Sequence, residues 1–350
     1  MKPELQRITS ATTKVRRLGY LVFFSKLLIE NPLPQLHLQQ NVLSEQSRNH
    51  KLLENASKEQ PVSRRKVTGE IRSPDAFKRY LGTAIEFGLI QEISGRLHNT
   101  KRGEILAALI EDENFFKLTI AQKYLLWKIV LDKDYDYVRN VILSTINSEK
   151  DEQIAFFTNL KELWQQKLRD ASLRNIDKYD NLRKAIGTKW NSQLRYYREN
   201  IKAPRIEWLL DLGAVEFWHV GKNHVCFRPN IKTLLDDNQN NFSNTLISFM
   251  EPILKMSKTY WNEIPLLKKY RLLEKLLSQS FVLFKPKDTI SKISANQFLE
   301  FGVSTLASYG IVCETRELDE SLERLIKSKT DKYRYVRIVS EADTGYISEL

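Results

Sequence analysis

Histidine and cysteine are the residues most often used for metal binding and covalent catalysis. This chain has five histidines and two cysteines. His219, His224 and Cys226 lie on the two sides of one expected hairpin, where they could approach a metal ion. A zinc site needs a fourth ligand, and three such residues around a turn are more often ordinary hairpin residues. Neither cysteine has the surroundings of a nucleophile. We therefore predict no metal site and no cofactor.

Carboxylates and glycine-rich loops give no firmer sign of catalysis. Asp132, Asp134 and Asp136 are typical of helix caps and solvated turns, because the glycine and distal glutamate of a calcium loop are missing. The chain has no Walker-type phosphate loop and no dinucleotide-binding fingerprint. A nuclease site built from distant carboxylates stays open as an alternative. The main prediction is a protein that is not an enzyme and has no small-molecule substrate.

Cationic side chains offer a different chemistry, the recognition of nucleic acid. The chain carries 55 Lys and Arg against 43 Asp and Glu, a formal net charge of +12. Such a protein attracts polyanions, with an affinity that falls steeply as salt rises. Arg79 could contact a guanine in bidentate fashion, whereas Lys78 is a point charge. The alternative is that the excess charge only keeps the protein soluble, and charge alone does not decide between the two.

The composition predicts a globular, mainly helical protein of the cytoplasm. Hydrophobic residues make up 42% and charged residues 28% of the chain, and 12 glycines and 10 prolines favour helices over a β-sandwich. Two distant cysteines, Cys226 and Cys313, fit a reducing compartment. The apolar stretch from Leu18 to Ile29 is too short for a membrane span and lacks a cleavage site. We expect no membrane association.

Apolar residues at helical spacing predict helices over much of the chain. The first, residues 14–30, ends before the prolines Pro32 and Pro34. The acidic tail after Ser340 is expected to fray. Further helices are expected over residues 41–57, from Ser73 onward, in several pieces between 119 and 200, and over 244–256, 265–277 and 294–309.

A pattern of helix, glycine and hairpin is the most informative feature of the sequence. Ser73 is a good N-cap, Pro74 suits the first turn, and Gly88 is placed to end the helix. The elements that come next are a strand at 89–93, a turn at Ser94-Gly95, a return strand at 96–99 and a helix opened by Thr100.

This run, with Leu89-Ile90, Gly95 and Thr100-Lys101-Arg102-Gly103, resembles the winged helix-turn-helix family over roughly residues 14–110. In DNA readers of that family the helix before the hairpin enters the major groove and the wing touches the backbone or the minor groove. The resemblance implies these DNA contacts: Lys78, Arg79 and Thr83 from the helix, Arg96 from the wing, and Arg72, Lys101 and Arg102 on phosphates. Gly82 would allow close backbone approach. The alternatives are a solvated helix face or a protein-interaction module.

Two weaker copies of the pattern occur further along the chain. The second has a helix at 203–212, a strand at 213–218 and a return strand at 224–227, and it offers Arg205, Lys222 and Arg228 to phosphate. Its helix also carries Glu207 and Asp211, so groove binding is less obvious. In the third copy a strand at 310–314 would pair with 333–339, and 318–330 would form a long wing. The basic stretch from 161 to 205 could track a phosphate backbone or be a solvated helix surface.

We therefore expect a mainly α protein with small β hairpins, made of tandem winged-helix modules joined by a helical region. The expected domains are 1–115, 116–240 and 241–350. The predicted function is non-catalytic binding of double-stranded DNA, as a regulator or the DNA-recognition subunit of a prokaryotic complex, in the cytoplasm or on the nucleoid. The alternative is a winged-helix scaffold that holds a protein partner, an ATPase or nuclease subunit. A homo-oligomer is also plausible.

Overall fold

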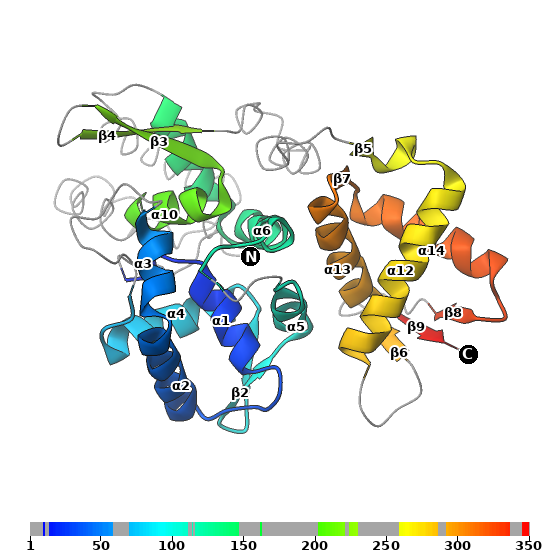
Figure 1. Ribbon diagram of the computed structural model, residues 1–350, viewed down its shortest axis with the longest axis horizontal. Coiled ribbons are helices and arrows are strands. Elements are labelled where there is room, and N and C mark those ends of the chain that lie inside the picture. Colours follow the sequence, from blue (N-terminus) through cyan, green and yellow to red (C-terminus); the bar gives the residue numbers. More distant parts are fainter. Residues whose placement is uncertain are drawn as a thin grey trace, which may run out of the picture.

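The structure is a computed structural model of the 350-residue chain. It describes residues 10, 14–58, 70–110, 114, 116–146, 162, 202–220, 224–229, 259–285, 292–336 and 345–349. Within these ranges the protein is mainly helical, with small sheets of two or three strands (Figure 1). This confirms the prediction of a mainly α protein with small hairpins. The expected domain boundaries at 115 and 240 and almost all of the basic stretch at 161–205 lie outside the described residues.

The N-terminal part, residues 14–110 and called the N-terminal half below, is built around α1 (Gly19–Leu27), whose residues are buried from Gly19 to Ser25. Helices α2 (Gln35–Arg48) and α3 (His50–Lys58) come after it, where one polar helix had been expected at 41–57. Next come α4 (Pro74–Glu86), the strands β1 (Ile90–Ile93) and β2 (Arg96–Asn99), and α5 (Lys101–Ala108).

Helix α4 has the ends that the sequence predicts. The Ser73 side chain caps it by accepting a hydrogen bond from the Ala76 amide at 3.2 Å. Gly88 ends it with φ of +69°, a conformation that favours glycine. Phe77 and Tyr80 on its inner face are fully buried, and the Tyr80 hydroxyl accepts hydrogen bonds from the amides of Arg16 and Arg17. The apolar face of α4 is therefore buried, while Lys78 and Arg79 on its other side are exposed.

A third extended segment joins the β1–β2 hairpin. Leu33 and Leu97 exchange two backbone hydrogen bonds, of 3.2 and 2.8 Å, as an antiparallel bridge. The hairpin passes close to α5, where a Cβ on Gly103 would lie 2.2 Å from the carbonyl oxygen of Leu89. The N-terminal half thus runs helix, extended residue, helices, strand, strand, with Leu33 beside β2 and β2 beside β1.

The middle of the chain supplies α6 (Ile120–Ile146), α10 (Ala203–Leu212) and the antiparallel strands β3 (Val215–Val220) and β4 (His224–Pro229). Helix α6 is kinked at Asp134, whose φ and ψ are −138° and 19°. The Asp134 carboxylate is completely buried and receives two hydrogen bonds from Arg205, at 2.6 and 2.7 Å. The expectation that Asp134 belongs to a solvated turn is therefore wrong.

In the described part of the C-terminal half, α12, α13 and α14 pack against one another, beside a three-stranded sheet and a parallel pair of two-residue strands. Its elements in order are β5 (Thr259–Tyr260), the 3₁₀ turn η4 (Trp261–Glu263), α12 (Leu266–Phe284), β6 (Lys292–Ser294), α13 (Ala295–Ser308), β7 (Ile311–Val312), α14 (Thr315–Ser328), β8 (Tyr333–Val336) and β9 (Tyr346–Glu349). Strand β9 is central, with β6 on one side and β8 on the other, both antiparallel.

Two expectations for this half are corrected. The residues after Gly310 do not pair with those after Tyr333, because β7 pairs in parallel with β5. Helix α14 is therefore a packed helix with buried Leu318, Leu322 and Leu325, and is not part of a wing. The tail was expected to fray, but Ile347 lies fully buried at the centre of the sheet.

The two halves are alike in the order of their elements and in the pairing of their strands. The first runs α1, Leu33, α2 and α3, α4, β1, β2, and the second runs α12, β6, α13, β7, α14, β8, β9, where the two-residue strand β7 has no counterpart in the first. In both, the first extended segment pairs with the last strand, which also pairs with the strand before it. Helix α13 packs against α5 and α6 and so joins the halves. None of the described helices is long and apolar enough to cross a membrane.

Candidate nucleic-acid interface

The outer face of α4 carries the two cations on which the prediction of DNA binding rests. Lys78 and Arg79 are both exposed. They are not the only charges there, because Asp75 on the first turn is paired with Lys14 and lies 3.8 Å from the Arg79 guanidinium. The hydrogen bond from Lys14 lowers the pKa of Asp75. The N-terminal half of α4 is therefore an exposed, net cationic surface with one carboxylate inside it.

The C-terminal half of α4 is covered by the chain itself. Thr83 is fully buried, its hydroxyl donates to the Arg79 carbonyl at 3.0 Å, and it lies 2.9 Å from the Ser10 hydroxyl. The Ser10 amide donates to Glu86 at 3.3 Å. A Cβ on Gly82 would lie 3.0 Å from the Ser10 Cβ. Thr83 and Gly82 were expected to face DNA, and this is wrong because Ser10 occupies that side of the helix.

The hairpin that follows α4 has an exposed tip. Ile93, Ser94, Gly95 and Arg96 are all exposed, and Ser94 and Gly95 turn the chain with φ of 51° and 75°. Arg96 thus stands on a surface that a backbone or groove could reach. Arg72, just before α4, is also exposed, but its guanidinium lies 2.5 Å from a carboxylate oxygen of Glu70.

The two cations at the start of α5 differ in their surroundings. Lys101 is exposed. Arg102 is more than half buried, and its guanidinium donates to both carboxylate oxygens of Glu300 on α13, from Nη2 at 2.7 Å and from Nε at 3.2 Å. Lys128 lies 3.9 Å from the same carboxylate, and burial lowers its pKa. Arg102 was expected on phosphate, but its side chain instead joins α5 to α13.

The second hairpin unit does not present its helix to solvent. Arg205 is 1% exposed, paired with Asp134, and its guanidinium carbon lies 4.9 Å from the Tyr137 ring centroid. The expectation that Arg205 contacts DNA is therefore wrong. Arg228 lies on β4 opposite Glu216, and Lys222 lies outside the described residues.

Helix α10 is docked on the N-terminal segment through groups that no sequence pattern connects. The Trp208 ring nitrogen donates to the Val15 carbonyl at 2.9 Å. Asp211 accepts from the Leu18 amide at 2.9 Å and pairs with the Arg17 guanidinium at 3.1 Å. Such contacts join residues almost 200 positions apart, so no local spacing in the sequence announces them. The polar side chains of α10 are therefore bonded inside the protein and do not face solvent.

Glu207 is the least satisfied group of this joint. It is 1% exposed, its nearest cation is the Arg16 guanidinium at 3.1 Å, and neither of its oxygens accepts a hydrogen bond within the described residues. Burial raises the pKa of Glu207 to about 8. A carboxyl group with this pKa loses its proton just above neutral pH. The contact between α10 and the N-terminal segment should therefore depend on pH.

Helix α14 comes directly before the last two strands of the C-terminal half, as α4 comes directly before β1 and β2 in the first. Its outer face exposes Arg316, Arg324 and Lys327, in a part of the chain that was expected to form a wing. These cations alternate with acids, and Arg316 pairs with Glu320 at 2.9 Å. The face of α14 is therefore mixed in charge and has no cationic surface like that around Lys78.

No group of three or more metal-ligating side chains occurs among the residues that the structure describes. The candidates from the sequence lie on β3 and β4, where His219 pairs with Val225, His224 with Val220 and Cys226 with Trp218. None of the three is the ladder partner of another.

Comparison of the chain with protein families, with curated proteins and with solved structures returns no match. A function for this chain must therefore be argued from the geometry of its described residues.

Proposed function

We propose that the N-terminal half is a winged helix-turn-helix module that binds double-stranded DNA without catalysis. The order helix, extended segment, helix, helix, strand, strand supports this, together with the pairing of the first segment beside the last strand. It is the order expected when a recognition helix precedes a wing. The α12–β9 half has a similar order of elements, and we propose that it too has the winged-helix fold, without a role in DNA binding.

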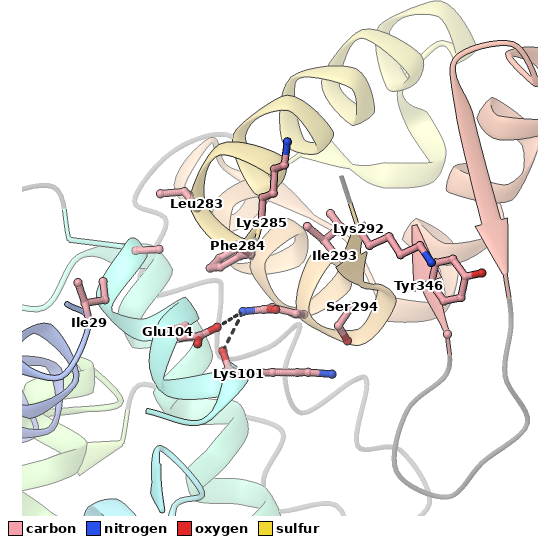
Figure 2. A pocket seen from close by; sticks show the side chains of 13 residues that line it. Ile29, Lys101, Glu104, Leu283, Phe284, Lys285, Lys292, Ile293, Ser294 and Tyr346 are labelled. Atoms are coloured by element: carbon pink, nitrogen blue, oxygen red, sulfur yellow. Dashed lines mark hydrogen bonds between the residues drawn. The ribbon is translucent and has the colours of Figure 1, made fainter. Parts of the chain in front are cut away.

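The observation that carries DNA binding is the exposure of Lys78 and Arg79 on α4, together with the exposure of Arg96 at the tip of the hairpin that follows this helix. In Figure 1, α4 lies to the left of α1, on the side away from the C-terminal elements. Phosphate contacts from Arg96 and Arg72 would position the duplex, and Arg79 would contact base edges. Lys101 is left out of this surface because it lines a pocket shared with residues of the C-terminal half (Figure 2).

The middle unit does not contribute a reading helix in this proposal. Its helix α10 has Arg205 buried in an ion pair and Asp211 bonded to the N-terminal segment. The unit is better explained as a brace that fixes the position of α1 and the segment before it. The chain would thus use its first module for DNA and its middle for support.

The scaffold alternative has one observation in its favour. Helix α12 exposes Val282 at 84% and Leu267 at 75%, and large exposed apolar side chains are typical of contact surfaces. These residues lie in the C-terminal half, whereas the cations lie in the first. Both activities could therefore belong to one protein, with DNA on the first half and a protein partner on the second.

The test is binding of a fluorescent duplex of random sequence by the full chain across a salt series. The double variant Lys78→Ala/Arg79→Ala should weaken binding about tenfold or more at low salt and lower the salt slope by about two. The control is Lys268→Ala/Arg271→Ala, which removes two exposed cations from α12. A folded protein that binds no duplex at low salt, or equal losses in the two variants, would overturn the proposal.

A further inference from the structure

The segment of residues 14–18, just before α1, contacts both α10 and α4. On the α10 side it meets Glu207, a buried carboxyl group beside the Arg16 guanidinium. We infer that the joint between this segment and α10 regulates DNA binding: a rise in pH above neutral loosens the segment from α10 and lowers the affinity of α4 for a duplex. The inference rests on the proposed function, because it concerns the same surface of α4.

Two side chains of α10 hold the segment by hydrogen bonds, and a third does not. The Trp208 ring nitrogen donates to the Val15 carbonyl, and Asp211 accepts from the Leu18 amide, both at 2.9 Å. Glu207 lies between them in the sequence of the helix and has an Arg16 nitrogen at 3.1 Å, but neither of its oxygens accepts a hydrogen bond within the described residues. The charged form of Glu207 is therefore the least stabilised group in the joint.

Loss of the Glu207 proton makes the closed joint less favourable. The residue is 1% exposed, and burial raises its pKa to about 8, although Arg16 and Arg17 act in the opposite direction. Burial therefore outweighs the attraction of the two arginines. At about pH 9 the carboxylate is mostly charged, and it gains full hydration only when the segment moves away from α10. Opening of the joint thus becomes easier as the pH rises.

The groups around the joint leave Glu207 as the one that changes charge near neutral pH. Among the described side chains, the charged and titratable groups there are Arg16 and Arg17 on the segment, Asp211 on α10, Tyr80 on α4, Lys123 on α6, and the buried pair of Arg205 and Asp134. Burial raises the pKa of Asp211 too, but the Arg17 guanidinium and the Leu18 amide both favour its charged form. Glu207 has no hydrogen bond of this kind.

The same segment reaches the proposed DNA surface. The amides of Arg16 and Arg17 donate to the Tyr80 hydroxyl on the inner face of α4. Lys14 pairs with Asp75 on the first turn of this helix, 3.8 Å from the Arg79 guanidinium. A segment that moves away takes the Lys14 ammonium with it and leaves the Asp75 carboxylate behind. Both changes weaken the attraction of this surface for phosphate.

The first measurement is hydrogen exchange of the full-length protein, followed by mass spectrometry from about pH 6 to about pH 9 and corrected for the intrinsic effect of pH on exchange. The protection of the amides of residues 16–18 should fall at least about tenfold over this range. At the upper end these amides should exchange faster than those of α14, because the segment opens without unfolding of the whole chain. Glu207→Gln, which cannot ionise, should abolish the fall, and so should Glu207→Met.

The second measurement is a fluorescence anisotropy titration of a labelled duplex at fixed low salt from about pH 7 to about pH 9, above the usual range of histidine. The affinity of the natural chain should fall about three- to tenfold, and that of Glu207→Gln should stay level. Asp75→Asn should reduce the fall, because the departing segment then leaves no carboxylate behind. Asp331→Asn, which removes an exposed acid of the C-terminal half, should keep the full fall.

Two results would overturn the inference. One is protection of residues 16–18 that is independent of pH, or equal to that of α14 at every pH. The other is a duplex affinity that does not change with pH, or that falls equally in Glu207→Gln, and this would leave the proposed function standing. A protein that binds no duplex at any pH, while residues 16–18 open as expected, would instead refute the proposed function and retain the pH-sensitive joint.

Discussion

Arg102 and Glu300, 198 positions apart, form a two-pronged ion pair that joins α5 of the first half to α13 of the second. Lys128 of α6 lies 3.9 Å from the same carboxylate, so three helices meet at one acidic side chain. The pocket of Figure 2 lies beside this ion pair. The relative position of the halves therefore depends on charges that no single element supplies.

The first prediction concerns that ion pair. A double-mutant cycle with Arg102→Gln and Glu300→Gln should give a coupling energy of about 1 kcal/mol in the free energy of unfolding, because the pair is partly but not fully buried. The control cycle uses Arg316 and Glu320, an exposed pair on one helix, and should give only about 0.3 kcal/mol. Equal couplings in urea denaturation would contradict the structural role of Arg102.

The second prediction concerns the buried pair of Arg205 and Asp134. Arg205→Met should lower the free energy of unfolding by about 3–5 kcal/mol, because it removes the ion pair of a fully buried carboxylate at the kink of α6. Adding Asp134→Asn to the same protein should recover part of this loss, since the remaining group carries no charge. If the double variant were the less stable of the two, the pair would not be the cause.

The third prediction comes from the raised pKa of Glu207. The folded protein holds a proton on this group between the unfolded pKa of about 4.3 and the folded pKa of about 8. In this window the folded state binds more protons than the unfolded state, so stability falls as pH rises. Protein stability should therefore decline from about pH 5 to about pH 8.5 in denaturation experiments, by an amount on the order of several kcal/mol.

Glu207→Gln should flatten that decline, because glutamine stays neutral throughout. The variant should be more stable than the natural chain at about pH 8.5 and similar to it at about pH 5. Glu92→Gln, on the exposed β1 strand, controls for the removal of one carboxylate. An unchanged pH profile in Glu207→Gln would mean that other groups cause the decline.

The fourth prediction rests on the proposed DNA binding. Asp75 lies inside the cationic surface of α4, paired with Lys14 and 3.8 Å from Arg79. Asp75→Asn should increase duplex affinity by about two- to tenfold at low salt, because it removes repulsion of phosphate and releases both cations. The measurement is the same anisotropy titration. Asp331→Asn, an exposed acid in the C-terminal half, should have no such effect. A loss of affinity in Asp75→Asn would argue that DNA binds elsewhere.

Local chemistry was enough to predict α4 and the hairpin that follows it, but not the division of the expected helix at 41–57 into α2 and α3. Ser73 as a cap, Gly88 as a terminator and Ser94-Gly95 as a turn act on their immediate neighbours, and all three do in the structure what the sequence indicates. The exposure of Lys78 and Arg79 also results from helical period, because the apolar side chains of α4 must face the core. The mainly helical character of the chain has the same origin.

The tertiary structure decided which polar groups remain available. Thr83 and Arg205 satisfy the same local pattern as exposed residues, yet Ser10 covers one and Asp134 pairs with the other. Both partners lie more than 70 positions away, so no local spacing reveals them. Strand pairing was non-local too, since β9 inserts between β6 and β8 and turns an apparent tail into the centre of a sheet. Periodicity fixes which face of an element is apolar, but only the packing of distant segments determines what covers its polar face.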